Sequence, residues 1–366
     1  MKLLFWTKII LKHNYKTTWL FIALTVLNLS VAAAGSGIPE GAPFYEEQLI
    51  FDQTRGRPQC HASTMTELPD GDILASWFAG SYEKATDVAI LSSRFSLQTN
   101  TWAVPEILND APGLSEGNPV LFTGPGGRVW FFYLVMYGDT WNDCKIHYRI
   151  SEDGGRAWGP ENTLISTKGF ALRNRPIILD NGTFLVPAAN EMLYTPLFIL
   201  TKNDFKSIKK TGTNLRDEGG LDQPTVVQLS DGSVLALFRS TQAKAMIMKS
   251  VSTDRGLTWS APEPTEFPNP EAGIAMARLS NGRLVLVYND SPRTRSPLTV
   301  AMSADDGKTW PWKRNIETDP FEFSYPCVIQ SGDGLIHVSY TYKRTHIKHV
   351  VFNEEWITRQ SADTEQ

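Results

Sequence analysis

The stretch Ser303-Ala-Asp-Asp-Gly-Lys-Thr-Trp310 decides the fold, because its pattern S-x-D-x-G-x-x-W occurs three times in the chain. The other two copies span residues 151–158 and 252–259. In each copy the Asp can accept hydrogen bonds from the backbone of its own turn, and the Gly suits a position with positive φ. The Trp is a large apolar anchor between sheets. Each copy is therefore predicted to be a folded hairpin, and the repetition predicts a repeat protein.

Six units with one order of strands and turns follow each other after Tyr45. A unit has a first strand, an Asp-Gly, Asn-Gly or Gly-Gly turn, a second and a third strand, and then the position of the hairpin. The first two hairpin motifs lie 101 residues apart and the last two lie 51 apart, which matches two units and one unit. The predicted first strands are Ala62–Leu68, Asn118–Thr123, Arg175–Leu179, Gln223–Leu229, Ile274–Leu279 and Tyr325–Gln330.

Six four-stranded units of this length predict an all-β fold, a six-bladed β-propeller that residues 45–358 form as one domain. The segment Phe44–Phe51, before the first unit, also has the character of a strand. We expect it to become the outer strand of the last blade. This pairing would close the ring and leave no sheet edge exposed.

The composition excludes some classes of function. The 366 residues are 42% hydrophobic, which is ample for a large core, and the net charge of −4 offers no basic surface for nucleic acid. No metal-binding motif is visible, and we expect no cofactor and a monomeric protein. Cys60, Cys144 and Cys327 are interpreted as small core residues, although an exported chain could pair two of them.

The first 34 residues resemble a secretory signal. Four lysines precede an apolar run over residues 19–33, and Ala32-Ala33-Ala34 suits a cleavage site. The chain is therefore expected to be secreted or periplasmic. The long basic region leaves an uncleaved membrane anchor as an alternative, although the apolar run is short for a spanning helix.

The three motifs and the six-unit pattern resemble the sialidase (neuraminidase) superfamily, whose members carry such Asp-box, or BNR, repeats. The resemblance covers nearly all of the chain after the signal. It implies a glycoside hydrolase of the exo-α-sialidase type, which removes a terminal acidic sugar from an oligosaccharide or polysaccharide. It also implies that the repeated hairpins are structural and lie away from the catalytic face.

Three residues match the places where sialidases hold their catalytic groups. Arg239 ends the second strand of the fourth unit, and Arg295 precedes the third strand of the fifth. The resemblance implies that both bind the substrate carboxylate, which suits the planar fork of a guanidinium. Tyr325 opens the sixth unit, where the nucleophile belongs, and a tyrosine needs a base to take its proton.

Two positions depart from the sialidase pattern. His61 stands where the first carboxylate-binding arginine belongs, and Gln223 stands where the glutamate partner of the tyrosine belongs. Glutamine cannot act as a base, so Asp222 or Glu218 would have to substitute for it. His61 can itself act as an acid or a base near neutral pH.

The remaining candidates lie in loops near the starts and ends of strands. Asp87 is the first choice and Glu83 the second for the acid that protonates the leaving oxygen, because both follow the second strand of the first unit. Arg175 is expected to bind substrate, with Arg173 beside it. Further contacts to the sugar are expected from Tyr137, Trp141, Asn190 and Glu191.

Two alternatives to a sialidase-type hydrolase stay open. His61 and Gln223 favour a propeller enzyme that cleaves beside a uronic acid, as a lyase or as a glycosidase assisted by the histidine. Gln223 alone also fits a propeller that binds glycans without cleaving them. The concentration of ionisable groups at the strand starts argues against this last alternative.

Overall fold

A computed structural model of the chain describes residues 39, 41–52, 56–202 and 204–359. The predicted signal segment, residues 1–34, lies outside them. The described residues belong to one compact unit that begins at residue 36. In its described residues, no helix has both the length and the apolar character needed to cross a membrane.

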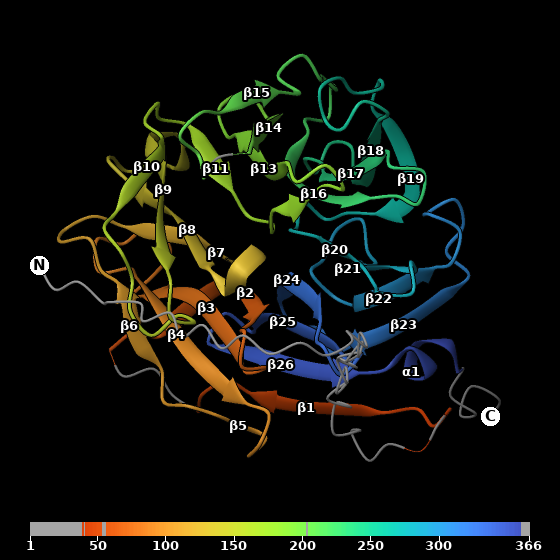
Figure 1. Cartoon of the computed structure of the whole chain (residues 1–366), viewed down its shortest axis with the longest axis horizontal. Helices are drawn as coiled ribbons and strands as arrows, with labels where there is room; N and C mark the ends of the chain where they lie inside the picture. The colour runs from red at the N-terminus through yellow and green to blue at the C-terminus, as the bar shows by residue number, and fades with distance from the viewer. Residues whose placement is uncertain (1–38, 40, 53–55, 203, 360–366) are drawn as a thin grey trace, which may run out of the picture. The chain divides into compact units, whose positions relative to one another are not determined.

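Six antiparallel sheets stand around a common centre and form a β-propeller (Figure 1). This confirms the predicted fold class. The blades in chain order are β2 (Gln59–Glu67), β3 (Ile73–Gly80), β4 (Ala89–Ser96), β5 (Thr101–Trp102) and β6 (Glu106–Asn109); β7 (Glu116–Thr123), β8 (Val129–Met136), β9 (Cys144–Ser151) and β10 (Asn162–Ile165); β11 (Phe170–Leu172), β12 (Ile177–Ile178), β13 (Phe184–Asn190), β14 (Thr195–Thr201) and β15 (Lys209–Thr211); β16 (Asp222–Gln228), β17 (Val234–Arg239), β18 (Met246–Ser252) and β19 (Glu263–Pro268); β20 (Ala275–Arg278), β21 (Leu284–Asn289), β22 (Leu298–Ser303) and β23 (Trp312–Glu317); and β24 (Phe323–Gln330), β25 (Ile336–Tyr342), β26 (His346–Phe352) and β1 (Tyr45–Leu49).

Within the part of the chain that the structure describes, three short helices lie outside the blades: η1 (Pro125–Gly127), η2 (Trp141–Asp143) and α1 (Glu354–Thr358). The middle strands are apolar on both faces because each blade packs between two neighbours. Strand β8, with the sequence VWFFYLVM, is buried at all eight positions. The core is therefore a series of apolar layers between adjacent blades rather than one central cluster.

The N-terminal strand closes the ring, as predicted. Strand β1 pairs antiparallel with β26, with Tyr45 opposite Phe352 and Leu49 opposite Lys348. The ring of Tyr45 also stacks on Trp356 of α1 at a centroid distance of 4.6 Å. The last blade thus combines the two ends of the folded domain.

The repeated hairpins have the predicted local structure. In the second copy, the Asp254 carboxylate accepts a hydrogen bond from the Thr258 amide at 2.7 Å, and Gly256 has a φ of +84°. Trp259 stacks on Phe198 of the preceding blade with the ring centroids 4.0 Å apart. Each hairpin therefore ties its blade to the one before it.

The three cysteines are buried and free, which confirms their interpretation as core residues. One prediction about the strands was wrong. The inner strand expected at Arg175–Leu179 is interrupted, and two short strands, β11 and β12, pair with β13 instead. Pro176 has no amide hydrogen for a sheet ladder, and the side chains of Arg173 and Asn174 reach the backbone of other blades.

Candidate active site

Four inner strands carry a β-bulge near their start, and these bulges shape the site. At each bulge the register slips and one residue that is not glycine takes a positive φ, which is uncommon for such residues. The four residues are Ala62 in β2, Asn118 in β7, Gln223 in β16 and Tyr325 in β24, with φ values of 57°, 41°, 43° and 53°. A bulge re-aims the side chains around it, and here it turns Tyr325 and Gln223 toward Arg239.

The hydroxyl of Tyr325 lies beside a guanidinium. Arg239 Nη1 donates to Tyr325 Oη at 2.6 Å and to Gln223 Oε1 at 3.0 Å. Arg239 ends β17, and both it and Tyr325 are buried. A positive donor at this distance stabilises negative charge that develops on the phenol oxygen as the hydroxyl gives up its proton.

Two more arginines lie around the same tyrosine and share one carboxylate. The guanidinium carbon of Arg295 is 5.4 Å from the centroid of the Tyr325 ring. Arg295 and Arg344 both donate to Glu322 Oε1 at 2.8 Å. Burial would raise the pKa of Glu322, but the charges of Arg344 and Arg295 hold that pKa below its usual value. Arg344 also donates to Glu83 at 2.6 Å.

Arg173 holds the backbone of Tyr325 through hydrogen bonds. Its Nη2 lies 2.6 Å from the carbonyl oxygen of Tyr325 and 2.9 Å from that of Ser63, and it donates to these bulged backbones. Its neighbour Asn174 donates to the carbonyl oxygens of Gln223 and Pro224 at 3.1 Å each. Arg173 and Asn174, which lie in the interrupted strand of the third blade, therefore donate hydrogen bonds to backbone carbonyl groups at the bulges of β2, β16 and β24.

His61 lies against the ring of Tyr325. The two ring centroids are 4.2 Å apart, and His61 Nδ1 is 2.8 Å from the hydroxyl of Thr341. Burial lowers the pKa of His61 well below its usual value, and the charges of Arg344 and Arg295 lower it further. The imidazole is therefore neutral at physiological pH, which is the form that can accept a proton.

A second group of carboxyls lies around Arg239. Asp222 Oδ2 lies 3.6 Å from the guanidinium and Glu271 Oε1 lies 3.7 Å from it. Glu191 hydrogen-bonds to the side chain of Gln223, so Gln223 bridges Arg239 and Glu191. Burial, together with the charge of Asp222, raises the pKa of Glu191 to about 8.

The two candidates for the acid lie in different surroundings. The carboxylate of Asp87 is exposed and accepts a hydrogen bond from the Ser81 hydroxyl at 2.5 Å, which lowers its pKa. Glu83 instead accepts from Arg344 and from the indole of Trp141, the latter at 3.3 Å. Glu83 therefore contacts Arg344, one of the three arginines around Tyr325, directly. The role of each as an acid stays a prediction.

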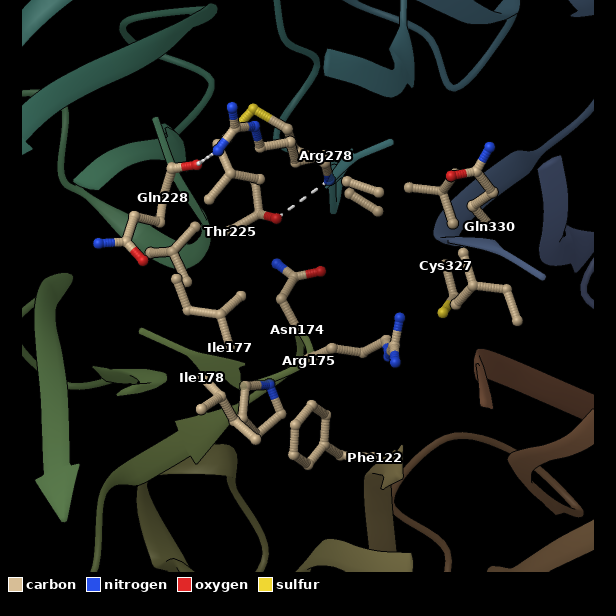
Figure 2. A pocket seen from close by; sticks show the side chains of 18 of the residues that line it. Phe122, Asn174, Arg175, Ile177, Ile178, Thr225, Gln228, Arg278, Cys327 and Gln330 are labelled. Carbon is tan, nitrogen blue, oxygen red and sulfur yellow. Dashed lines mark hydrogen bonds between the residues drawn. The ribbon is translucent and has the colours of Figure 1, made fainter. Parts of the chain in front are cut away.

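Three other predicted residues, Glu218, Tyr137 and Arg175, make none of the contacts with Tyr325 described above. Glu218, named as a substitute base, is exposed. Tyr137 is exposed and its hydroxyl lies 3.2 Å from His147. Arg175 lines a cavity together with residues of the inner strands β16, β20 and β24 (Figure 2). Its predicted part in substrate binding stays a prediction.

Sequence reasoning missed Arg344, Glu322 and Glu271 as parts of the site. Arg344 follows the second strand of the sixth blade, much as Arg239 ends the second strand of the fourth. Glu322 directly precedes the inner strand β24. A search of every unit for an arginine at or just after the end of its second strand would therefore have found Arg344 as well as Arg239. Among the described residues, no three His, Cys, Asp or Glu side chains are placed to hold a metal ion.

Comparisons with known proteins agree with this architecture. A family model described as a BNR repeat-like domain matches residues 71–338. A sialidase from Micromonospora viridifaciens is 26% identical over 388 aligned positions, which cover 92% of this chain and 58% of that protein. The chain thus spans little more than half the length of this curated relative.

Two solved structures have the same fold at low sequence identity. The NanB sialidase from Streptococcus pneumoniae superposes with a TM-score of 0.73 and 13% identity, over 85% of this chain and 71% of that one. The intramolecular trans-sialidase from Ruminococcus gnavus also gives a TM-score of 0.73 at 13% identity, over 85% of this chain and 98% of that one. At these identities the likeness is one of fold alone.

Proposed function

The chain belongs to the family of BNR repeat-like domains, and from this premise we propose that it is a sialidase-type glycoside hydrolase that removes a terminal acidic sugar from a glycan. The observation that carries the proposal is the position of the Tyr325 hydroxyl, 2.6 Å from Arg239 and beside Arg295 and Arg344. Planar guanidinium groups suit a carboxylate, and the phenol is the nucleophile. The 26% identity to a sialidase supports the same class.

The residues divide the work as follows. Arg239, Arg295 and Arg344 hold and orient the substrate carboxylate, and Tyr325 Oη attacks the anomeric carbon. Gln223 cannot take the proton of the Tyr325 hydroxyl, so we assign that proton to one of the two carboxylates beside Arg239, Asp222 or Glu271. The hydrogen bond that Arg239 donates stabilises the negative charge left on the phenol oxygen. Asp87 or Glu83 gives its proton to the leaving oxygen.

A second candidate function rests on His61. Its neutral imidazole lies 4.2 Å from the ring of Tyr325, and Gln223 replaces the glutamate expected of a sialidase. These two features favour cleavage beside a uronic acid, with His61 as the base.

The basic and apolar first 34 residues support a further proposal, that the protein acts outside the cytoplasm.

One product analysis with two variants tests these proposals. The protein is incubated with sialyl-lactose and with a uronate-rich polysaccharide, and the products are examined for free sialic acid and for unsaturated uronate. We expect sialic acid. Tyr325→Phe should lower kcat by roughly a thousandfold or more, because the covalent step is lost, while His61→Ala should reduce it less.

The matched control is Tyr340→Phe, which removes a buried hydroxyl from the same blade, where it donates to Glu317 at 2.6 Å. Its turnover should be unchanged. An inactive His61→Ala enzyme beside a Tyr325→Phe enzyme of near-normal rate would show that the uronate reaction is the correct one. Binding of either glycan with no product would indicate a propeller that only binds.

A further inference from the structure

A cavity of about 520 Å³ opens at the end of the central channel away from the candidate active site. It is lined by the later residues of the inner strands β16 and β24, by β20, and by β12 with the segment that joins β11 to it. His61, Gln223 and Tyr325 lie instead at the starts of inner strands. The inner strands of a propeller run in the same direction along the channel, so the two sites face its opposite ends.

The cavity has an unbalanced positive charge. Three of its lining residues are arginines, namely Arg173, Arg175 and Arg278, and none of the described lining residues is Asp or Glu. Two of these arginines already have partners. Arg173 donates to the carbonyl oxygen of Tyr325, and Arg278 donates to that of Gln228 at 3.1 Å.

Arg175 has no such partner. Its Nε is buried without a hydrogen bond, and none of its nitrogens pairs with a described residue. Its guanidinium carbon lies 5.9 Å from the ring of Phe122. Figure 2 shows the side chain reaching into the cavity between Phe122 and Cys327, with no dashed line to it. A partly buried charge without a counter-ion is destabilising, and a bound anion would remove that penalty.

We propose that this cavity is a second binding site, for a small organic anion whose carboxylate, sulfate or phosphate group pairs with Arg175. A volume near 520 Å³ lies in the usual range of small-molecule pockets and far exceeds the space that one inorganic ion fills. The lining combines apolar side chains, among them Phe122, Ile177 and Val226, with polar ones such as Asn174 and Gln330, and it therefore suits a ligand body that has both kinds of surface. The cavity shares Arg173 with the surroundings of Tyr325, but the proposed ligand takes no part in the reaction at the candidate active site.

The first test measures thermal unfolding and calorimetric binding with three probes: inorganic phosphate, sulfate and glucuronate. We expect each to raise the melting temperature of the wild-type protein and glucuronate to bind most tightly, because only glucuronate is large enough to contact the rest of the lining as well as Arg175. Arg175→Gln and Arg175→Met should weaken this binding by at least about tenfold, because the charge-assisted bidentate contact is lost. Without anions, both variants should melt at or above the wild-type temperature.

Two control variants distinguish anion binding at Arg175 from anion binding at other arginines. Arg293→Gln removes an exposed charge at the other end of the channel, and Arg295→Gln removes one beside Tyr325. Both should keep the phosphate and sulfate response. If the response survives in the Arg175 variants and disappears in Arg295→Gln, the anions bind only at the active site and the proposal is wrong.

A wild-type crystal soaked in selenate gives a second measurement that needs no variant. An anomalous peak beside the Arg175 guanidinium supports the site. A peak found only around Arg239 and Arg295, or no peak and no melting response at all, overturns it.

Discussion

Around Tyr325, Arg239, Arg295 and Arg344 each face at least one acidic group, and this balance decides how the site responds to pH. Arg239 faces Asp222 and Glu271, and Gln223 links it to Glu191. A carboxyl in such a group stays protonated when burial and a like charge oppose its ionisation. The site is therefore less negative near neutral pH than a count of its carboxyls indicates.

Glu191→Gln tests this balance at the residue scale. With a pKa raised to about 8, Glu191 is neutral below that pH and ionised above it. Ionisation adds a negative charge near Arg239, so kcat/KM for an acidic substrate should fall by about tenfold as pH rises through 8. Glu191→Gln should remove this decline, and Glu218→Gln, which changes an exposed carboxylate, should keep it. A decline that persists in Glu191→Gln would assign the titration to another group.

At the scale of the element, the repeated hairpins and the bulged strands have different roles. The hairpins hold neighbouring blades together through Trp and Gly packing, far from the tyrosine. The bulges hold Tyr325 and Gln223 in a backbone conformation that is uncommon for such residues. Changes in a hairpin should therefore alter stability without altering catalysis.

Gly256→Ala tests the role of the hairpin, with Gly334→Ala as its matched control. Both glycines have a positive φ, +84° and +87°. A Cβ at Gly256 would lie 2.8 Å from Leu185 of the preceding blade, whereas a Cβ at Gly334 meets nothing within 4 Å. Gly334→Ala should lower the free energy of unfolding by about 1 kcal/mol and Gly256→Ala by about 2–4 kcal/mol, measured in urea. Equal losses would show that the contact between blades adds nothing.

At the scale of the whole molecule, the fold is a ring whose closure depends on a single short strand. Strand β1 has five residues and supplies the outer edge of the last blade. In a closed ring each blade packs on two others, so the loss of one contact between blades lowers the stability of the whole ring. Stability should therefore be lost cooperatively when the closure is weakened.

Tyr45→Ala weakens the closure by removing the ring that stacks on Trp356 and faces Phe352. The free energy of unfolding should fall by about 2–3 kcal/mol. Tryptophan fluorescence and far-UV circular dichroism should then give the same lowered midpoint in urea. Tyr82→Ala, which removes a tyrosine that is 62% exposed, should leave the midpoint unchanged. Separate midpoints for the two signals would mean that the last blade opens alone.

The sequence by itself determined the blades, the closing strand and part of the site. Strand alternation, turn residues and the repeated motif are local signals, and five of the six inner strands follow them. The resemblance to sialidases, applied to the starts of the inner strands and the ends of the second strands, also located Tyr325, Gln223 and Arg239. Only the third inner strand departed, because Arg173 and Asn174 bond to the backbones of other blades, which no local pattern records.

Only the tertiary structure decided which charged residues meet. Glu322, Arg344 and Glu83 come from different loops, yet they form one chain of ion pairs beside Tyr325. The sequence favoured Arg175 over Arg173 for the site, but in the structure Arg173 is the one that bonds to the backbone of Tyr325, while Arg175 lines the cavity between the later parts of the inner strands. The physical reason is that loop conformation and the direction of a bulged residue depend on packing against neighbouring blades, and those neighbours are distant in the chain.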